Sequence, residues 1–476
     1  MKQFFSVLPA LWMAAVPLMG EGSAESFFAS REITRDANVG VMVVDVQSGE
    51  VVDACGQNRL LPPASTLKLL TTCTALELWG ADYRFVTLIE ADGTLSDGVL
   101  HGNLYVRGTG DPTISSEKMG DSRLLEHWAD RIKALGIRRI TGNVTADLTM
   151  WDNDEAVNPG WLWKDMGNYY AMGVYPLSYR DNTLKLYLQS GPEGTDAPLL
   201  DMDPKLPELT IRSHVRCTGV TYDNAYVYGA PGSSERWVTG EIPAGRGRFR
   251  VKADLPDPAL SLVRELTTRL QTAGVQVDGT AVCRKDGFDP QAYRQRRTLF
   301  VHESPTLGEI VHEINLHSNN LYAESVFRSL GMRDDTPATV AMSLQRIQDF
   351  WMEKGVDISR SILVDGCGLS PQNGLAPATL TALLCYMYRS AWAEVFQKSL
   401  AEAGASGTLR NFLAGTPLQH RVYAKSGTID HLKSYAGYLL LPDGRVLAFS
   451  VVVHNAHGSN AEVQRLIEQY LLTLAR

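Results

Sequence analysis

Two side chains with complementary chemistry stand three positions apart near the start of the chain. Ser65 carries a hydroxyl and Lys68 an amine, and residues at this spacing share one face of a helix. A serine hydroxyl becomes an effective nucleophile when an adjacent base removes its proton, and a neutral amine can be that base. Ser115 and Lys118 repeat the spacing without an apolar helix behind them, so we interpret that pair as a solvated turn. Ser65 is therefore the candidate nucleophile.

Two further short motifs raise this pair above a chance match. Ser318-Asn319-Asn320 lies between two predicted helices, residues 307–316 and 321–330. Lys425-Ser426-Gly427 precedes a predicted strand hairpin, residues 434–441 and 446–453. The order SxxK, SxN, K[ST]G is the signature of penicillin-binding proteins and related β-lactamases. Together the three motifs predict acyl transfer through a covalent serine intermediate.

Each motif residue has an expected role in cutting a peptide that ends in D-Ala-D-Ala. Lys68 takes the proton of Ser65, provided that burial and the nearby charge of Lys425 lower the pKa of Lys68. Ser318 passes a proton to the leaving amine, and Asn320 holds Lys68 and the substrate amide. The remaining positions are expected to bind substrate: Lys425 and Ser426 its terminal carboxylate, Gly427 its backbone along the strand edge, and Thr428, with Ser65, its oxyanion through backbone N–H groups.

Composition and the first residues indicate which partners and which location to expect for the protein. The net charge of -8 over 476 residues argues against a nucleic-acid partner, because phosphate binding needs a basic surface. Lys2, an apolar stretch over residues 4–19 and small residues up to Ala24 predict a secretory signal cleaved after Ala24, with a membrane anchor as the alternative. We expect a periplasmic protein with at most peripheral membrane contact.

Cysteines and histidines give little reason to expect a metal. The six cysteines include no CxxC pair, and Cys217–Cys283 is the one disulfide we predict, because both residues fall in one inferred domain. His312, Glu313 and His317 come close to HExxH, but histidines five apart do not share one helix face. We therefore predict neither a metal site nor a cofactor.

The two ends of the chain share a pattern of predicted strands and helices that indicates one mixed domain. β-prone residues 39–46 turn at Ser48-Gly49 and continue at residues 51–52, and a helix is predicted over residues 65–79. The last helix, residues 463–474, has one apolar face that favours packing on a sheet, with a membrane-surface helix as the alternative.

The middle of the chain, residues 83–297, has a different pattern of predicted elements. It alternates short strands with turns rich in Gly, Pro and Asp. It contains one predicted helix, residues 123–135, followed by a predicted strand, residues 137–144. We interpret it as one or two domains inserted into a host that both chain ends build.

At this point the sequence resembles the type-4 (class C, low-molecular-mass) penicillin-binding proteins, which are D-alanyl-D-alanine carboxypeptidases that also act as endopeptidases. Residues 69–317 separate the first motif from the second, which is similar to this family and unlike β-lactamases. The resemblance covers nearly the whole mature chain. Its further segments are residues 63–66 and 68–71, 108–112, 160–163 with Asp165, 365–370 and 407–409.

The resemblance implies an α/β fold. It is a serine transpeptidase/β-lactamase-like host, an antiparallel sheet flanked by helices, with a large nested insertion of two smaller mixed domains. The boundaries that we predict are a signal peptide at 1–24, a catalytic domain at 25–83 and 296–476, an inserted domain II at 84–110 and 186–295, and a nested domain III at 111–185.

The resemblance also implies how the substrate side chain is bound. Asp165 matches an acidic residue that reaches over the site to the free amino group of a diaminopimelate side chain, and Tyr170 matches an aromatic position beside it. The chain departs from the family in two places: Pro371 stands where members often have Arg, and Asp430 where some have Gln. These departures put recognition of a diaminopimelate carboxylate in question.

The function predicted from the sequence is a penicillin-binding D-Ala-D-Ala carboxypeptidase and peptidoglycan DD-endopeptidase. Its partners are peptidoglycan stem peptides and β-lactams. The competing hypotheses are a β-lactamase or esterase of the same fold and a sensor domain that acylates without turnover. The balance of the two peptidase activities, the third stem residue and the oligomeric state stay open.

Overall fold

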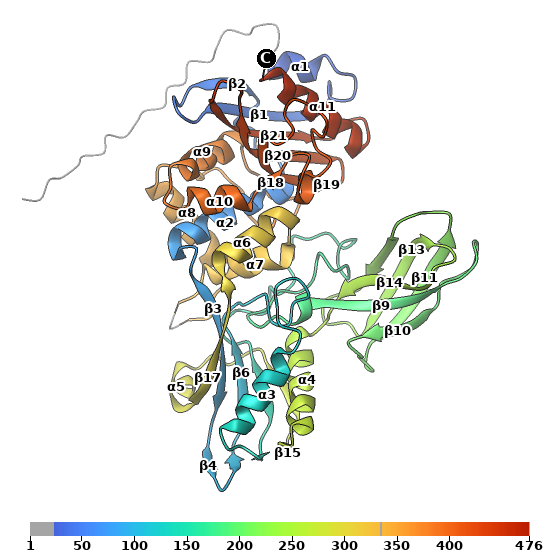
Figure 1. Cartoon of the computed structure of the whole chain (residues 1–476), viewed down its shortest axis with the longest axis vertical. Coiled ribbons are helices and arrows are strands. Elements are labelled where there is room, and N and C mark those ends of the chain that lie inside the picture. The colour runs from blue at the N-terminus through green and yellow to red at the C-terminus, as the bar shows by residue number, and fades with distance from the viewer. Residues whose placement is uncertain (1–22, 334–335, 476) are drawn as a thin grey trace, which may run out of the picture.

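The computed structural model describes residues 23–333 and 336–475. Its host domain is built on a six-stranded antiparallel sheet in the order β18-β19-β20-β21-β1-β2 (Figure 1). Both ends of the chain therefore contribute to one sheet, as the sequence predicted. The strands are β1 (Asn38–Asp45), β2 (Val51–Cys55), β18 (Ala401–Glu402), β19 (Val422–Ile429), β20 (Leu432–Leu440) and β21 (Val446–His454).

Helices cover both faces of the host sheet because its strands are apolar on both sides. α1 (Ala24–Ala29) and α11 (Asn460–Thr473) pack on one face, where Phe28 and Tyr470 join the buried core. A larger group of helices packs on the other face around a second core. Its members are α2 (Lys68–Trp79), α6 (Leu307–His317), α7 (Asn320–Ser329), α8 (Val340–Glu353), α9 (Pro377–Tyr388) and α10 (Ala393–Ser399).

Local signals fix where the helices of the site begin. Thr306 and Glu309 form a reciprocal capping box at the start of α6. Asn319 accepts a hydrogen bond from the N–H of Tyr322 and so caps α7. Because α7 starts only three residues after α6 ends, Ser318 adopts a left-handed conformation at φ 61° between them. The SxN motif is thus held in a tight bend between two buried helices.

The insertion folds as two bodies (Figure 1). The first contains a five-stranded sheet, β16-β8-β6-β3-β17, a four-stranded sheet, β15-β7-β5-β4, and the helices α3 (Leu124–Ala134), α4 (Pro258–Thr272) and α5 (Pro290–Gln295). Its strands are β3 (Arg84–Ala91), β4 (Thr94–Ser96), β5 (Val99–His101), β6 (Leu104–Gly108), β7 (Arg139–Ile140), β8 (Val144–Asp147), β15 (Gln276–Val277), β16 (Ala281–Arg284) and β17 (Arg297–Thr306).

The second body of the insertion is formed by two three-stranded sheets, β10-β9-β14 and β11-β13-β12. A long connection, residues 148–182, joins the two bodies and reaches the host: Asn158 Nδ2 donates to the carbonyl of Val364 at 2.7 Å. The strands are β9 (Thr183–Ser190), β10 (Leu199–Asp203), β11 (Thr210–Thr218), β12 (Asn224–Tyr228), β13 (Glu235–Pro243) and β14 (Gly247–Asp254).

The sheets divide the insertion at residues other than those predicted. Residues 111–185 were expected to form the nested domain, but β8 pairs with β6 and β16, so this stretch shares a sheet with both flanking segments. By strand pairing, the nested body comprises residues 183–254 instead. β17, predicted in the host, pairs with β3 of the insertion. These boundaries follow from pairing between strands that lie far apart in the sequence, and a local sequence pattern does not reveal such pairing.

Two local predictions also differ from the structure. The strand predicted over residues 137–144 is split into β7 and β8, which lie in different sheets because the chain crosses between the sheets at residues 141–143. The predicted disulfide Cys217–Cys283 is absent, and both thiols are free. Cys217 lies in β11 and Cys283 in β16, which belong to the two separate bodies.

The last helix packs as predicted. Val463, Ile467 and Leu471 of α11 are buried against the host sheet, in agreement with a core helix. In the described part of the chain, no helix is both long and apolar enough to cross a membrane. The predicted signal peptide, residues 1–24, lies almost entirely outside the described residues.

Candidate active site

Ser65, the candidate nucleophile, stands in a short 3-10 turn, Ala64–Leu67, that leads directly into α2. Ala64 has a positive φ of 47°, which an L residue adopts only under constraint. Gly368 supplies part of that constraint, because a Cβ there would lie 1.9 Å from the carbonyl oxygen of Ala64. Two segments that are far apart in sequence therefore fix the backbone on which Ser65 stands.

Lys68 has three oxygen partners in this structure. Its Nζ lies 2.9 Å from Ser65 Oγ, 2.7 Å from Asn320 Oδ1 and 2.6 Å from the carbonyl oxygen of Cys367. The lysine is fully buried. The SxxK and SxN motifs thus meet at one amine, as the sequence predicted, whereas the carbonyl of Cys367 was not foreseen.

Burial lowers the pKa of Lys68, while the nearby carboxyls of Asp365 and Glu324 oppose this effect. Burial, together with the charge of Lys68, also brings the pKa of Lys425 well below its usual range. The expected repulsion between the two lysines therefore acts on Lys425. The largest influence on Lys68 is the removal of water, which favours the neutral amine that a general base needs.

The second motif links the host to the insertion. Asn320 binds Lys68 through its oxygen, and its Nδ2 donates to the carbonyl of Tyr170 at 2.8 Å. Ser318 lines the same pocket as Ser65, and its hydroxyl makes no hydrogen bond with other described residues. Ser318 is therefore positioned beside the nucleophile with its hydroxyl available to a substrate.

The third motif occupies an open strand edge. β18 pairs with β19 only at Tyr423 and Ala424, so this edge has no partner strand from Lys425 to Ile429. Lys425 is buried and donates to the carbonyl of Ser426 at 2.7 Å, while Ser426 Oγ donates to Thr408 Oγ1 at 2.8 Å. An extended peptide can pair with such an edge through its backbone.

Gly427 also has a packing role that the sequence did not reveal. A Cβ at this position would lie 2.2 Å from Ser434 Oγ, 2.9 Å from the carbonyl of Pro63 and 3.0 Å from the Cβ of Ala64. The glycine is required because β19 packs directly on the turn that carries the nucleophile. Thr428 is exposed at the end of the open edge, where its hydroxyl accepts from Lys433 Nζ at 2.9 Å.

The connection between the two bodies of the insertion brings Asp165 and Tyr170 to the site. The Tyr170 hydroxyl donates to Asp165 Oδ1 at 3.1 Å, and burial raises the pKa of both groups. Lys164, which the sequence analysis did not single out, forms an ion pair with Asp430. All four side chains line the Ser65 pocket with Pro371, so the negative charge of Asp430 is balanced inside that pocket.

Two buried carboxyls, those of Asp365 and Glu324, fix the loop whose Cys367 carbonyl contacts Lys68. Asp365 accepts hydrogen bonds from the N–H of Gly368 at 2.7 Å and from Trp161 Nε1 at 2.9 Å, and Glu324 accepts from the N–H of Gly366 at 2.7 Å. These contacts hold the Cys367 carbonyl against Lys68. Burial raises the pKa of Glu324 to about 7. In the sequence, only the Asp-Gly-Cys-Gly run could have indicated that this loop is held by buried carboxyls.

These two carboxyls, with Cys367, also form the one group of potential metal ligands in the described residues. Glu324, Asp365 and Cys367 offer ligand atoms within 4.8 Å of one another, although the sequence analysis expected no such cluster. Backbone and indole N–H groups already occupy the two carboxyls, which fits a structural role. Of the HExxH-like residues, His317 lies 3.7 Å from Glu313, and His312 contacts the carbonyl of Lys398.

Comparison with known proteins identifies the family of this chain. The model of the D-Ala-D-Ala carboxypeptidase 3 (S13) family matches residues 25–475. The chain belongs to this family. The D-alanyl-D-alanine carboxypeptidase of Actinomadura sp. strain R39 is 30% identical, over 96% of this chain and 86% of that protein. The D-alanyl-D-alanine carboxypeptidase DacB of Haemophilus influenzae is 22% identical, over 88% of this chain and 86% of that protein.

The S13 family assignment also agrees with the fold. The crystal structure of penicillin binding protein 4 (dacB) from Haemophilus influenzae superposes with a TM-score of 0.80 at 20% identity, covering 94% of this chain and 98% of that one. The predicted resemblance to class C penicillin-binding proteins and the predicted fold class are thus confirmed. This S13 chain has a penicillin-binding fold and belongs to a family of carboxypeptidase hydrolases.

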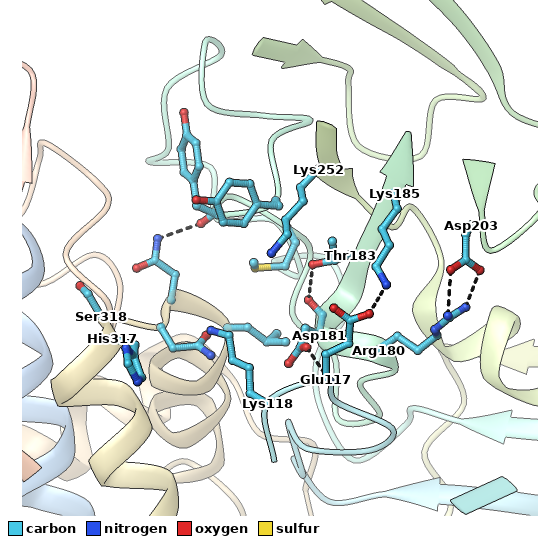
Figure 2. Close-up of a pocket in the computed structure, with 16 residues that line it drawn as sticks. Glu117, Lys118, Arg180, Asp181, Thr183, Lys185, Asp203, Lys252, His317 and Ser318 are labelled. Carbon is cyan, nitrogen blue, oxygen red and sulfur yellow. Dashed lines mark hydrogen bonds and ion pairs between the residues drawn. The ribbon is translucent and has the colours of Figure 1, made fainter. Parts of the chain in front are cut away.

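A second pocket adjoins the site of this S13 chain on the far side of Ser318 (Figure 2). Ser318, Asn320 and Tyr170 line both pockets, so one wall separates them. Lys118, set aside above as part of a solvated turn, lines the second pocket and forms an ion pair with Glu313 of α6 at 2.8 Å. That turn therefore contributes to a pocket beside the Ser65 pocket.

Proposed function

We propose that this protein is a serine-type D-Ala-D-Ala carboxypeptidase that also cuts peptidoglycan cross-links as a DD-endopeptidase, through an acyl-enzyme on Ser65. The observation that carries the proposal is the position of the buried Lys68 amine, 2.9 Å from Ser65 Oγ and 2.7 Å from Asn320 Oδ1. We also propose that the protein acts in the periplasm, on the basis of the apolar segment at residues 4–19.

Acylation begins with the neutral amine of Lys68. It takes the hydroxyl proton of Ser65, and Ser65 Oγ attacks the carbonyl carbon of the penultimate D-Ala. The backbone N–H groups of Ser65 and Thr428 stabilise the oxyanion that develops. As the C–N bond breaks, Ser318 gives its hydroxyl proton to the departing amine and takes in return the proton that Lys68 accepted, which restores the neutral lysine. Water hydrolyses the resulting ester and restores the serine.

Binding of the substrate uses the open edge of β19. The peptide pairs with residues Lys425–Thr428, and its terminal carboxylate is held by Lys425 and Ser426. This carboxylate gives the buried Lys425 an anionic partner. In the free enzyme, burial and the charge of Lys68 depress the pKa of Lys425. Asp165 and Tyr170 receive the side chain of the third stem residue, next to the Lys164–Asp430 pair.

β-Lactams are the second ligand class that we propose. They present an acylating carbonyl and a carboxylate at the same two points as the peptide. The Haemophilus influenzae penicillin binding protein 4 has also been solved in complex with a β-lactam, and that structure superposes on this chain with a TM-score of 0.75.

The experiment pairs fluorescent-penicillin labelling with mass spectrometry of muropeptides after digestion. Ser65→Ala should abolish labelling and peptide cleavage, and Lys68→Arg should label at least about 10²-fold more slowly, because a guanidinium stays protonated. Circular dichroism controls for folding. A folded Lys68→Arg variant that labels at the wild-type rate would overturn the mechanism, and labelling without peptide cleavage would identify a sensor domain instead.

A further inference from the structure

The second pocket is a mixed-charge hollow between the host and the insertion. Glu117 and Lys118 approach it from the turn after β6, Asp181 from the short turn before β9, Lys185 from β9 itself, and Lys252 from β14 (Figure 2). The host contributes the bend from His317 to Leu321. The pocket therefore exists only where the two parts of the molecule meet.

Most charges in this pocket are already paired. Glu117 forms an ion pair with Lys185, and Arg180 binds Asp203 through two contacts of 2.8 and 2.9 Å. Asp181 accepts a hydrogen bond from Ser116 Oγ at 2.6 Å and from the N–H of Glu117 at 3.1 Å. The carboxylates on the insertion side are thus occupied by groups of the protein itself.

Lys252 is the exception. Among the described residues no carboxylate lies within ion-pair distance of it, and its nearest recorded partner is the ring of Tyr169, whose centroid lies 5.5 Å from Nζ. Burial lowers the pKa of Lys252, and the charges of Arg250 and Lys118 lower it further, against the opposing effect of Glu117 and Asp181. The ammonium group stands in surroundings where an added anion would be stabilised.

The place of this pocket relative to the chemistry defines which part of a substrate can reach it. The acyl half lies in the Ser65 pocket with Asp165, Lys164 and Asp430. The leaving amine lies at Ser318, which is also the wall of the second pocket. In a cross-linked substrate that amine carries a second stem peptide, whose chain must continue past Ser318.

We propose that this pocket binds the leaving strand of a cross-linked peptide and that Lys252 holds a free carboxylate of that strand. The inference rests on the proposed endopeptidase function. A single D-Ala leaving group is too short to extend from Ser318 into the pocket. The pocket therefore contributes to cutting cross-links and not to trimming a pentapeptide.

The test compares Lys252→Met, which keeps the length of the side chain, with Lys252→Arg, which keeps its charge. Lys205→Met is the matched control, because Lys205 is an exposed lysine of the insertion outside this pocket. Four reactions are measured: cleavage of a cross-linked stem-peptide dimer, cleavage of the same dimer with the leaving strand's carboxylates amidated except the one next to the scissile amide, which the proposed mechanism assigns to Lys425 and Ser426, cleavage of a monomeric pentapeptide, and acylation by penicillin.

Lys252→Met should lower kcat/KM for the carboxylate dimer about 10- to 100-fold, mainly through KM, which corresponds to the loss of one charge-assisted contact. The pentapeptide and penicillin reactions should change less than about twofold, and Lys252→Arg should restore most of the dimer reaction. Wild-type enzyme should cut the amidated dimer as poorly as Lys252→Met does. Equal losses on dimer and pentapeptide, or an equal loss on both dimers, would refute the assignment.

Failure of the endopeptidase proposal gives a different result. If wild-type enzyme cuts the pentapeptide but no dimer, the proposed function is wrong. Calorimetric binding of the carboxylate dimer to Ser65→Ala then decides the pocket by itself. Binding weakened about 10-fold or more by Lys252→Met supports the site, and unchanged binding overturns it.

Discussion

Replacing Asn320 by Asp tests the proposed base with almost no change of shape. The substitution puts a carboxylate oxygen where Asn320 Oδ1 now lies, 2.7 Å from Lys68 Nζ. An opposite charge at such a distance shifts a pKa by about 1–3 units, here upwards for Lys68. At neutral pH the fraction of neutral lysine, and with it the acylation rate, should fall about 10- to 1000-fold.

The pH dependence carries the decisive information. Acylation by a fluorescent penicillin, followed by stopped flow across the pH range in which the protein stays folded, should show the acid limb of the profile moved about 1–3 units towards alkaline pH. The rate should recover as the pH rises. Asn319→Asp adds the same charge one residue away without touching Lys68, and it should leave the limb in place.

Asn320→Ala separates charge from geometry. It removes the contacts to Lys68 and to the Tyr170 carbonyl but adds no charge, so any loss of rate should persist at alkaline pH. If Asn320→Asp instead reacts at the wild-type rate near pH 7, or its limb moves towards acid pH, Lys68 does not act as a neutral base.

Four further outcomes are expected. Gly427→Ala should destabilise the fold by about 1–3 kcal/mol in urea unfolding, because its Cβ would meet Ser434 Oγ at 2.2 Å; an unchanged midpoint would show that β19 can shift. Asp165→Ala should slow cleavage of cross-linked muropeptide more than acylation by penicillin, and parallel losses would count against its role. Burial raises the pKa of Glu324 from its ordinary 4.5 to about 7, so wild-type stability should fall as the pH rises from about 4.5 through 7, and Glu324→Gln should flatten that fall in thermal melts; parallel curves would contradict it. Edman sequencing of envelope-extracted protein should begin at Glu25, and a sequence starting at Met1 would contradict cleavage.

The catalytic motifs were predictable because each sits in a local structure that its own neighbours dictate. Ser65 and Lys68 share a helical face, and the capped starts of α6 and α7 place Ser318 and Asn320 in the bend between them. The periodic apolar pattern of α11 also identified its buried face correctly. Local signals were sufficient in these cases.

The remaining features depend on contacts between distant segments. The Cys367 carbonyl reaches Lys68 only because Asp365 and Glu324 fix its loop, and Gly427 is required by a turn about 360 positions earlier in the chain. The division of the insertion follows the pairing of β8 with β6 and β16. No pattern within a short window contains such information, so the boundaries were mispredicted and the packing role of Gly427 was not foreseen.

The position of β1 inside the host sheet has a consequence for biosynthesis. β1 needs β21 as its neighbour on one side, and β19, which carries Lys425, follows Ser65 only after the whole insertion has been made. Because β1 and the turn that carries Ser65 contact strands that lie several hundred residues later in the chain, the domain cannot close until nearly the full chain is available. The nascent serine is thus kept without its base-activating surroundings until synthesis ends. Loss of α11 would leave α1 as the remaining helix on that apolar face of the finished sheet, with much of the face uncovered.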